Sequence, residues 1–277
     1  MHQVRGATPS LVEGVALTVQ GRRARSSEGP AMTLDRSFSF DRVYNFRDLG
    51  GYATADGRVV RWRRLFRSGE LQRMSEDEVA RTRAALGIVT VIDFRSAEEA
   101  NDPRGFGGLS DPPTRRHHLP MGNARSKFEA RESGRWDPAY VSMLEEHGDD
   151  WAQAVHVLAG DDSYPALFHC VTGKDRTGVL AALVLDTLGV DEATILADYA
   201  DSQRAMDLLV ERLRASGAVG PDRPPNPALG VVPSAMAEML TTLRERYGSA
   251  RGFLRARGVQ PHVFDALEAH LLEAPAS

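Results

Sequence analysis

The chain has little of two features that mark common structural classes: cysteine and long apolar runs. It has 1 Cys in 277 residues, which excludes an intrachain disulfide framework and a zinc site built from several thiolates. No run approaches the ~18 uninterrupted apolar residues of a membrane span. The formal net charge is -4, which argues against a general binder of nucleic acid or anionic membrane. We therefore expect no metal, no nucleic acid and no integral membrane contact, while the oligomeric state is not indicated.

The amino-terminal part of the sequence differs in composition from the rest. Residues 1–33 are rich in Gly, Ser, Arg and Pro without periodicity, which predicts a disordered leader before a single domain over residues 34–277. The most apolar stretch of this part, residues 11–19, contains Glu13 and precedes a cluster of arginines, the reverse of a secretory signal peptide. The sequence therefore favours a cytoplasmic location, and it leaves open export without such a signal.

Strand and helix signals alternate along the chain. This alternation predicts an α/β fold with a mostly parallel central sheet, helices on both faces and an added C-terminal helical part. We expect a loop over residues 45–52 and strands within residues 59–68, 88–94, 115–120 and 166–170. Helices are expected over residues 75–86, 137–159 with a break at Gly148, 177–188, 191–214, 234–247, 250–257 and 261–272. The Pro-rich end of residues 191–233 makes this segment a candidate helical lid.

The segment HCVTGKDRTG, residues 169–178, lies between a predicted buried strand and a predicted helix. A tight strand-to-helix turn directs several backbone N–H groups at one point, and the helix adds its positive end, so the turn suits a tetrahedral anion. The same surroundings favour the thiolate form of Cys170 at the base of the loop. The planar guanidinium of Arg176 can bind two phosphoryl oxygens at once.

This loop resembles that of the atypical bacterial tyrosine and lipid phosphatases, HC-x-x-GKDRT, in the cysteine-dependent phosphatase superfamily. The motifs NFRDLGGY (45–52), LFRSGEL (65–71) and IDFRS (92–96) also match that family in order and spacing, so the resemblance covers about residues 38–272. It implies a cysteine-phosphatase-like fold and a phosphomonoester hydrolase that uses a phosphocysteine intermediate without metal or cofactor. The implied substrates are phosphotyrosine proteins, with phosphoserine, phosphothreonine and phosphoinositides as further candidates.

The resemblance also implies roles for the residues of the loop. Cys170 would be the nucleophile, Arg176 would bind phosphate and stabilise the transition state, and Asp175 would be the general acid. Lys174 would add a second cation, which suits substrates with more than one phosphate. The remaining implied roles are phosphate binding by Val171, Thr172 and Gly173, support of the loop by His169, and donation of a hydroxyl hydrogen to the sulfur by Thr177.

Three charged residues outside the loop are expected to support it. Asp93 ends a predicted parallel strand, where α/β enzymes place ligands, so it is a second candidate for the general acid. A structural ion pair explains Asp93 equally well. Arg47 and Asp48 of NFRDLGGY are expected to brace the loop rather than to catalyse.

Trp136-Asp137-Pro138 is interpreted as the start of a helix and not as a mobile acid loop.

Two other functions are alternatives. A rhodanese-like sulfurtransferase also uses a cysteine in an anion-binding loop, but the pairs Lys174-Asp175 and Arg176-Thr177 and the NFRDLGGY motif argue against it. A non-catalytic phosphate-binding module would not need Cys170, Asp175 and Arg176 together. A phosphatase is therefore the leading hypothesis.

Overall fold

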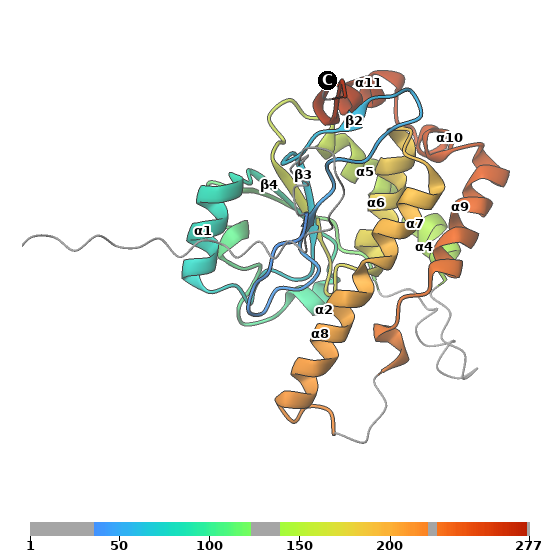
Figure 1. The fold of residues 1–277 in the computed structure, drawn as a ribbon. Coiled ribbons are helices and arrows are strands. Elements are labelled where there is room, and N and C mark those ends of the chain that lie inside the picture. The colour runs from blue at the N-terminus through green and yellow to red at the C-terminus, as the bar shows by residue number, and fades with distance from the viewer. Residues whose placement is uncertain (1–35, 123–138, 221–225, 276–277) are drawn as a thin grey trace, which may run out of the picture. The chain divides into compact units, whose positions relative to one another are not determined.

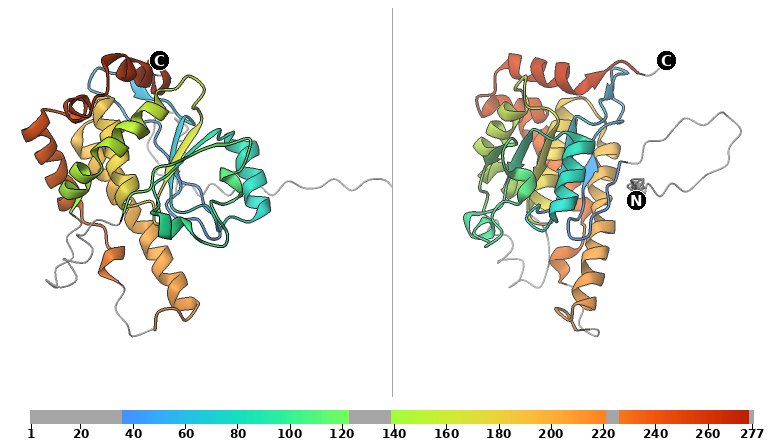
Figure 2. Two further views of the ribbon diagram at one scale, coloured as in Figure 1. Left: turned by 180° about the vertical axis from the view of Figure 1, so that it is seen from behind. Right: turned by 90° about the vertical axis from the view of Figure 1, so that its left-hand side faces the viewer.

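The computed structural model describes residues 36–122, 139–220 and 226–275. This described part contains a five-stranded sheet in the order β1-β3-β6-β4-β5, with helices on both faces (Figure 1, Figure 2). Strands β3, β6, β4 and β5 pair in parallel, and β1 pairs antiparallel with β3 at one edge. The predicted fold class is confirmed. The strands are β1 Arg47–Asp48, β3 Leu65–Ser68, β4 Thr90–Asp93, β5 Arg115–His118 and β6 Ala166–His169.

Side chains that alternate along the buried strands divide the core into two clusters. On β6, Leu167 joins a cluster with residues of α1, Glu76–Leu86, whereas Phe168 joins a larger cluster with residues of α6, Asp175–Thr187. Figure 1 shows α1 on one side of the sheet and α6 on the other. Because both faces of the sheet are covered by helices, the central strands β4 and β6 are buried along their whole length.

Local sequence signals account for several helix boundaries. Helix α1 begins with the predicted capping box, in which the Ser75 side chain accepts from the Glu78 N–H and the Glu78 carboxylate accepts from the Ser75 N–H. It ends at Gly87, whose φ of 60° is left-handed. The other helices are α2 Ala97–Ala100, α4 Tyr140–Glu146, α5 Gly148–Leu158, α7 Glu192–Ala200, α8 Ser202–Ala215, α9 Pro233–Tyr247, α10 Ala250–Ala256 and α11 Pro261–Leu271. Two 3₁₀ turns, η1 Gly108–Ser110 and η2 Pro227–Leu229, complete the helical elements of the described residues.

Two predictions about secondary structure need correction. The segment 45–52, predicted as a loop, contains the short strand β1, because Arg47 and Asp48 pair with the edge of β3. The helix predicted over 191–214 is two helices, since Asp201 ends α7 and begins α8. The predictions for residues 1–33 and for Trp136–Pro138 lie outside the described residues.

The chain closes on itself through a second, two-stranded sheet. Strand β2, Val59–Val60, pairs antiparallel with β7, Leu272–Glu273. Among the described helices, none combines the length and the hydropathy needed to span a lipid bilayer.

The carboxyl ends of the parallel strands β4, β5 and β6 meet at one edge of the main sheet, and the segments that follow them therefore lie close together.

Candidate active site

Cys170 directly follows β6 and is almost completely buried. Its Sγ accepts a hydrogen bond from the hydroxyl of Thr177 at 3.2 Å. Thr177 lies in the first turn of α6, so the loop between β6 and α6 folds back and brings the strand end against the helix start. The sulfur therefore lies at the base of the loop, beside the positive end of a helix.

Residues 170–176, which the sequence predicts to bind phosphate and which we call the phosphate loop, are held from outside through their carbonyl groups. The carbonyl of Val171 accepts from the Glu70 N–H at 3.0 Å, and the carbonyls of residues 172 and 173 accept from Asn45 Nδ2 at 3.3 and 2.8 Å. In a trans peptide the N–H of the next residue points opposite to the carbonyl. The N–H groups of residues 172–174 therefore point away from this support, as an anion-binding turn requires.

Gly173 lets the loop approach β3 closely. Its φ is +67°, and a Cβ built there would lie 2.4 Å from the carbonyl oxygen of Ser68. The Gly173 carbonyl also accepts from Arg67 Nη2 at 2.7 Å. Any side chain at this position would push the loop away from both partners.

A buried ion cluster connects the loop with α7. Asp198 accepts from Arg47 Nε at 2.9 Å and from Arg67 Nη1 at 2.5 Å, and Arg67 in turn holds Gly173. Burial by itself raises the pKa of Asp198, but the two guanidiniums outweigh it and hold this pKa well below its usual value. Arg47 is thus placed to brace the loop through Asp198 and Arg67.

Asp48, the neighbour of Arg47, contacts its own turn. Its carboxylate accepts from the Gly50 N–H at 2.8 Å and from the Arg63 N–H at 2.7 Å. These contacts fix the NFRDLGGY turn against the segment before β3 and do not involve the phosphate loop.

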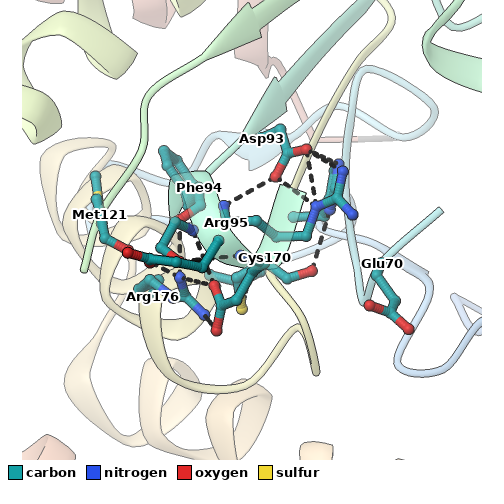
Figure 3. Close-up of polar contacts among 12 residues, drawn as sticks. Glu70, Asp93, Phe94, Arg95, Met121, Cys170 and Arg176 are labelled. Atoms are coloured by element: carbon teal, nitrogen blue, oxygen red, sulfur yellow. Dashed lines mark hydrogen bonds and ion pairs between the residues drawn. The ribbon is translucent and has the colours of Figure 1, made fainter. Parts of the chain in front are cut away.

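Asp93, at the end of β4, forms a buried ion pair with Arg95 next to the strand that Cys170 follows (Figure 3). Arg95 donates from Nε and Nη2 to Oδ2 of Asp93 at 3.0 and 2.7 Å, and both side chains are fully buried. His169 Nε2 lies 3.6 Å from the same carboxylate oxygen, and its Nδ1 donates to the Cys170 carbonyl at 3.1 Å. Burial lowers the pKa of His169, which keeps it neutral at neutral pH. Of the two interpretations of Asp93, this geometry favours the structural ion pair.

Arg176 lies on the same loop as Cys170 and is fixed by neighbouring segments (Figure 3). Its guanidinium donates to the carbonyls of Phe94 and Met121 and to the carboxylate of Glu99. Burial alone lowers the pKa of Arg176, but the charges of Cys170 and Glu99 outweigh it and raise this pKa. Arg176 precedes Thr177, whose hydroxyl contacts the Cys170 sulfur, so the cation and the sulfur lie at the same end of α6.

Asp175 and Lys174 project toward α4 and the segment before α9. Asp175 Oδ1 accepts from the Tyr140 hydroxyl at 2.8 Å and lies 3.5 Å from Lys174 Nζ. Lys174 Nζ also donates to the carbonyls of Ala228 and Gly230 at 2.6 and 2.7 Å. Its ammonium therefore contacts the η2 segment, whereas the sequence predicts a cation that faces phosphate.

Several residues of the site were missed in the sequence. Asn45 and Arg67 lie within recognised motifs, and Glu99 completes a capping-box pattern with Ser96, so a local signal was present for these three. Asp198 and Tyr140 carry no such signal. They reach the loop only because α7 and α4 pack against α6.

Comparison with known proteins agrees with this geometry. The model of the tyrosine phosphatase family matches residues 38–273. A Cupriavidus necator protein whose name assigns it to the tyrosine-protein phosphatases is 34% identical over 242 residues, covering 83% of this chain and 84% of its own length. The triple specificity protein phosphatase PtpB of Mycobacterium tuberculosis is 30% identical over 275 residues, covering 83% of this chain and 97% of its own. A tyrosine-protein phosphatase of Nostoc commune is 29% identical, covering 69% and 68%. The chain therefore belongs to the tyrosine phosphatase family of enzymes.

Proposed function

We propose that this phosphatase hydrolyses phosphotyrosine through a phosphocysteine intermediate at Cys170. The observation that carries the proposal is the position of the sulfur, 3.2 Å from the Thr177 hydroxyl in the first turn of the helix that also carries Arg176. The N–H groups of residues 172–174 and the guanidinium would hold the phosphoryl oxygens, and negative charge that develops on them would be stabilised.

The proposed reaction has two steps. In the first, the Cys170 thiolate forms a bond to phosphorus, the bond from phosphorus to the ester oxygen breaks, and the carboxyl group of Asp175 gives its proton to that oxygen. In the second, water attacks phosphorus, the phosphorus–sulfur bond breaks, and the Asp175 carboxylate takes a proton from the water. The Thr177 hydroxyl would stabilise the sulfur as it leaves as thiolate. The two steps together hydrolyse the ester to the free tyrosine hydroxyl and phosphate.

Lys174 bears on the range of substrates. In the structure its ammonium contacts Ala228 and Gly230, so a second phosphate on a substrate would have to displace these carbonyls. Phosphotyrosine needs no such change, which makes it the first candidate. Phosphoinositides are the second, and their binding would require the η2 segment to release Lys174. The name of the related PtpB, a triple specificity protein phosphatase, supports testing phosphoserine and phosphothreonine as well.

Among the described residues, the lid predicted over residues 191–233 would involve α8 and residues 226–233 rather than α7. Helix α7 carries the buried Asp198 and Tyr199, so it is anchored in the domain. Between α8 and residues 226–230 lies a cavity of about 480 Å³, so this part has room to move. We expect amide hydrogen exchange to be faster in α8 than in α7. Equally slow exchange in both helices would contradict the lid.

The decisive variant is Cys170→Ser. It should abolish turnover of phosphotyrosine peptide and leave the binding of inorganic phosphate, because the loop amides and Arg176 remain. The assay uses a thiol reductant, no added metal, and a panel of phosphotyrosine, phosphoserine, phosphothreonine, phosphoinositide and thiosulfate. Substantial turnover by the variant would contradict the phosphocysteine step, and preferential turnover of thiosulfate by the unsubstituted protein would favour the sulfurtransferase.

A further inference from the structure

The Arg176 guanidinium is held along one edge by groups outside the phosphate loop. Nη1 donates to the carbonyls of Phe94 at 2.9 Å and Met121 at 3.0 Å and to Glu99 Oε2 at 2.6 Å (Figure 3). Nη2 donates to Glu99 Oε1 at 3.1 Å. A guanidinium has five N–H groups. These contacts engage both hydrogens of Nη1 and one of Nη2, so Nε–H and the second Nη2 hydrogen form the edge that remains for an oxyanion.

Glu99 is itself oriented by the start of α2. Its Oε2 accepts from the Ser96 N–H at 2.9 Å, and its own N–H donates to Ser96 Oγ at 3.2 Å, which is a complete capping box. Only three residues separate the end of β4 from the start of α2. The position of the carboxylate is therefore tied to the edge of the sheet that also carries the phosphate loop.

We propose that Glu99 is a positioning residue for the phosphatase reaction, one that aims the Nε–Nη2 edge of Arg176 at two oxygens of the transferred phosphoryl group. This inference rests on the proposed function. Immobilising a long arginine side chain costs rotamer entropy, so a guanidinium that is fixed before the substrate arrives avoids this cost on binding. Two parallel hydrogen bonds to an oxyanion also depend strongly on orientation.

An opposite role for Glu99 would be to compete with phosphate for Arg176. The two roles predict opposite effects of removing the carboxylate charge. If Glu99 blocks the anion site, its neutralisation tightens the binding of inorganic phosphate. If it positions Arg176, neutralisation weakens that binding. The carbonyls of Phe94 and Met121 hold Nη1, the same nitrogen that Glu99 Oε2 contacts, which favours positioning.

Glu99→Gln separates the contact with Arg176 from the cap of α2. Glutamine can also complete a capping box, so the start of the helix is retained while the charge and one acceptor are lost. Glu98→Gln is the matched control on the same helix, since the Glu98 carboxylate contacts Ser96 Oγ at 2.9 Å. We expect Glu99→Gln to lower kcat/KM for an aryl phosphate about 10- to 100-fold. It should also raise the Kd for inorganic phosphate about tenfold, against changes of about twofold or less for Glu98→Gln.

The same substitution in an Arg176→Ala background tests whether Glu99 acts through Arg176. We expect the additional loss from Glu99→Gln to disappear there, because the two effects are coupled. A full additive loss from Glu99→Gln in the Arg176→Ala background would overturn the inference. Unchanged or tighter phosphate binding by the single variant Glu99→Gln would overturn it as well. If the unsubstituted protein hydrolyses no phosphomonoester, the proposed function fails, and calorimetric binding of inorganic phosphate still decides the role of Glu99. Equal melting temperatures of the two glutamine variants would show that both are folded.

Discussion

The hydroxyl of Tyr140 donates to Oδ1 of Asp175 at 2.8 Å. Since its single hydrogen is used there, the Tyr199 hydroxyl, 2.6 Å away, donates to the oxygen of Tyr140, and the Val232 N–H donates to Tyr199 at 3.3 Å. Burial raises the pKa of Tyr140 well above its usual value, so it stays protonated as a donor. With Oδ1 bound in this way, Oδ2 is the oxygen of Asp175 left to carry a proton toward a substrate.

Asp175→Asn should slow esters according to their leaving groups. The tyrosyl oxygen of phosphotyrosine is a poor leaving group and needs a proton as it departs, so we expect a loss of about 10²- to 10⁴-fold in kcat with phosphotyrosine peptide. An activated aryl phosphate leaves without a proton, and its turnover should change far less. The comparison variant is Asp93→Asn, because the sequence makes Asp93 the second candidate for the general acid. Equal slowing of both esters by Asp175→Asn would assign the acid to another residue.

Tyr140→Phe should reproduce part of this pattern. It removes the donor that orients Asp175 and keeps the aromatic ring, so we expect about tenfold slower turnover of phosphotyrosine peptide and little change with an activated aryl phosphate. Tyr247→Phe is a suitable control, because its hydroxyl contacts Glu145 at the surface. A uniform loss with both esters would instead indicate that Tyr140 supports only the fold.

Asp198→Asn should destabilise the protein strongly. It leaves the buried guanidiniums of Arg47 and Arg67 without their carboxylate, and loss of one partner from a buried ion cluster costs about 3–5 kcal/mol. The measurement is the free energy of unfolding in urea. Asp201→Asn, an exposed position at the start of α8, should change it by less than about 0.5 kcal/mol. A loss below about 1 kcal/mol for Asp198→Asn would show that the cluster is not structural.

Gly173→Ala should impair the phosphate loop more than the backbone strain of a positive φ alone would. Gly217 has a φ of +74° with open space around a built Cβ, whereas a Cβ at Gly173 would clash with the Ser68 carbonyl. We expect Gly217→Ala to cost about 1 kcal/mol of stability and to leave phosphate affinity unchanged. Gly173→Ala should lose phosphate affinity in addition. Equal phosphate affinities of the two variants would contradict the close approach of the loop to β3.

The buried His169 should make the protein less stable in mild acid. Burial lowers its pKa in the folded state, while in the unfolded chain the pKa stays near about 6.5. Below about pH 6.5 the unfolded state therefore binds a proton that the folded state does not, so stability falls as pH decreases. We expect the urea midpoint to drop between pH 7.5 and 5.5, and to drop less for His169→Gln. An identical drop in both proteins would exclude this contribution.

The fold and the loop were predictable because their signals are local. The apolar run before Cys170 and the capping box at Ser75 need only neighbouring residues, and both lie where the sequence places them. The orientation of Lys174 was not predictable, because its partners Ala228 and Gly230 lie more than 50 residues away. The roles of Asp198 and Tyr140 depend in the same way on helix packing, which composition and spacing do not encode.

The pairing of β2 with β7 has a consequence for biosynthesis. Val60, which is fully buried, lies beside Leu272, and the Arg61 N–H donates to the Leu271 carbonyl at 2.7 Å. A ribosome makes residue 60 long before residue 272, so this small sheet forms only after translation has passed the last helix. Until then Val60 lacks its partner strand, so we expect this part of the domain to complete its folding only after the whole chain has been made.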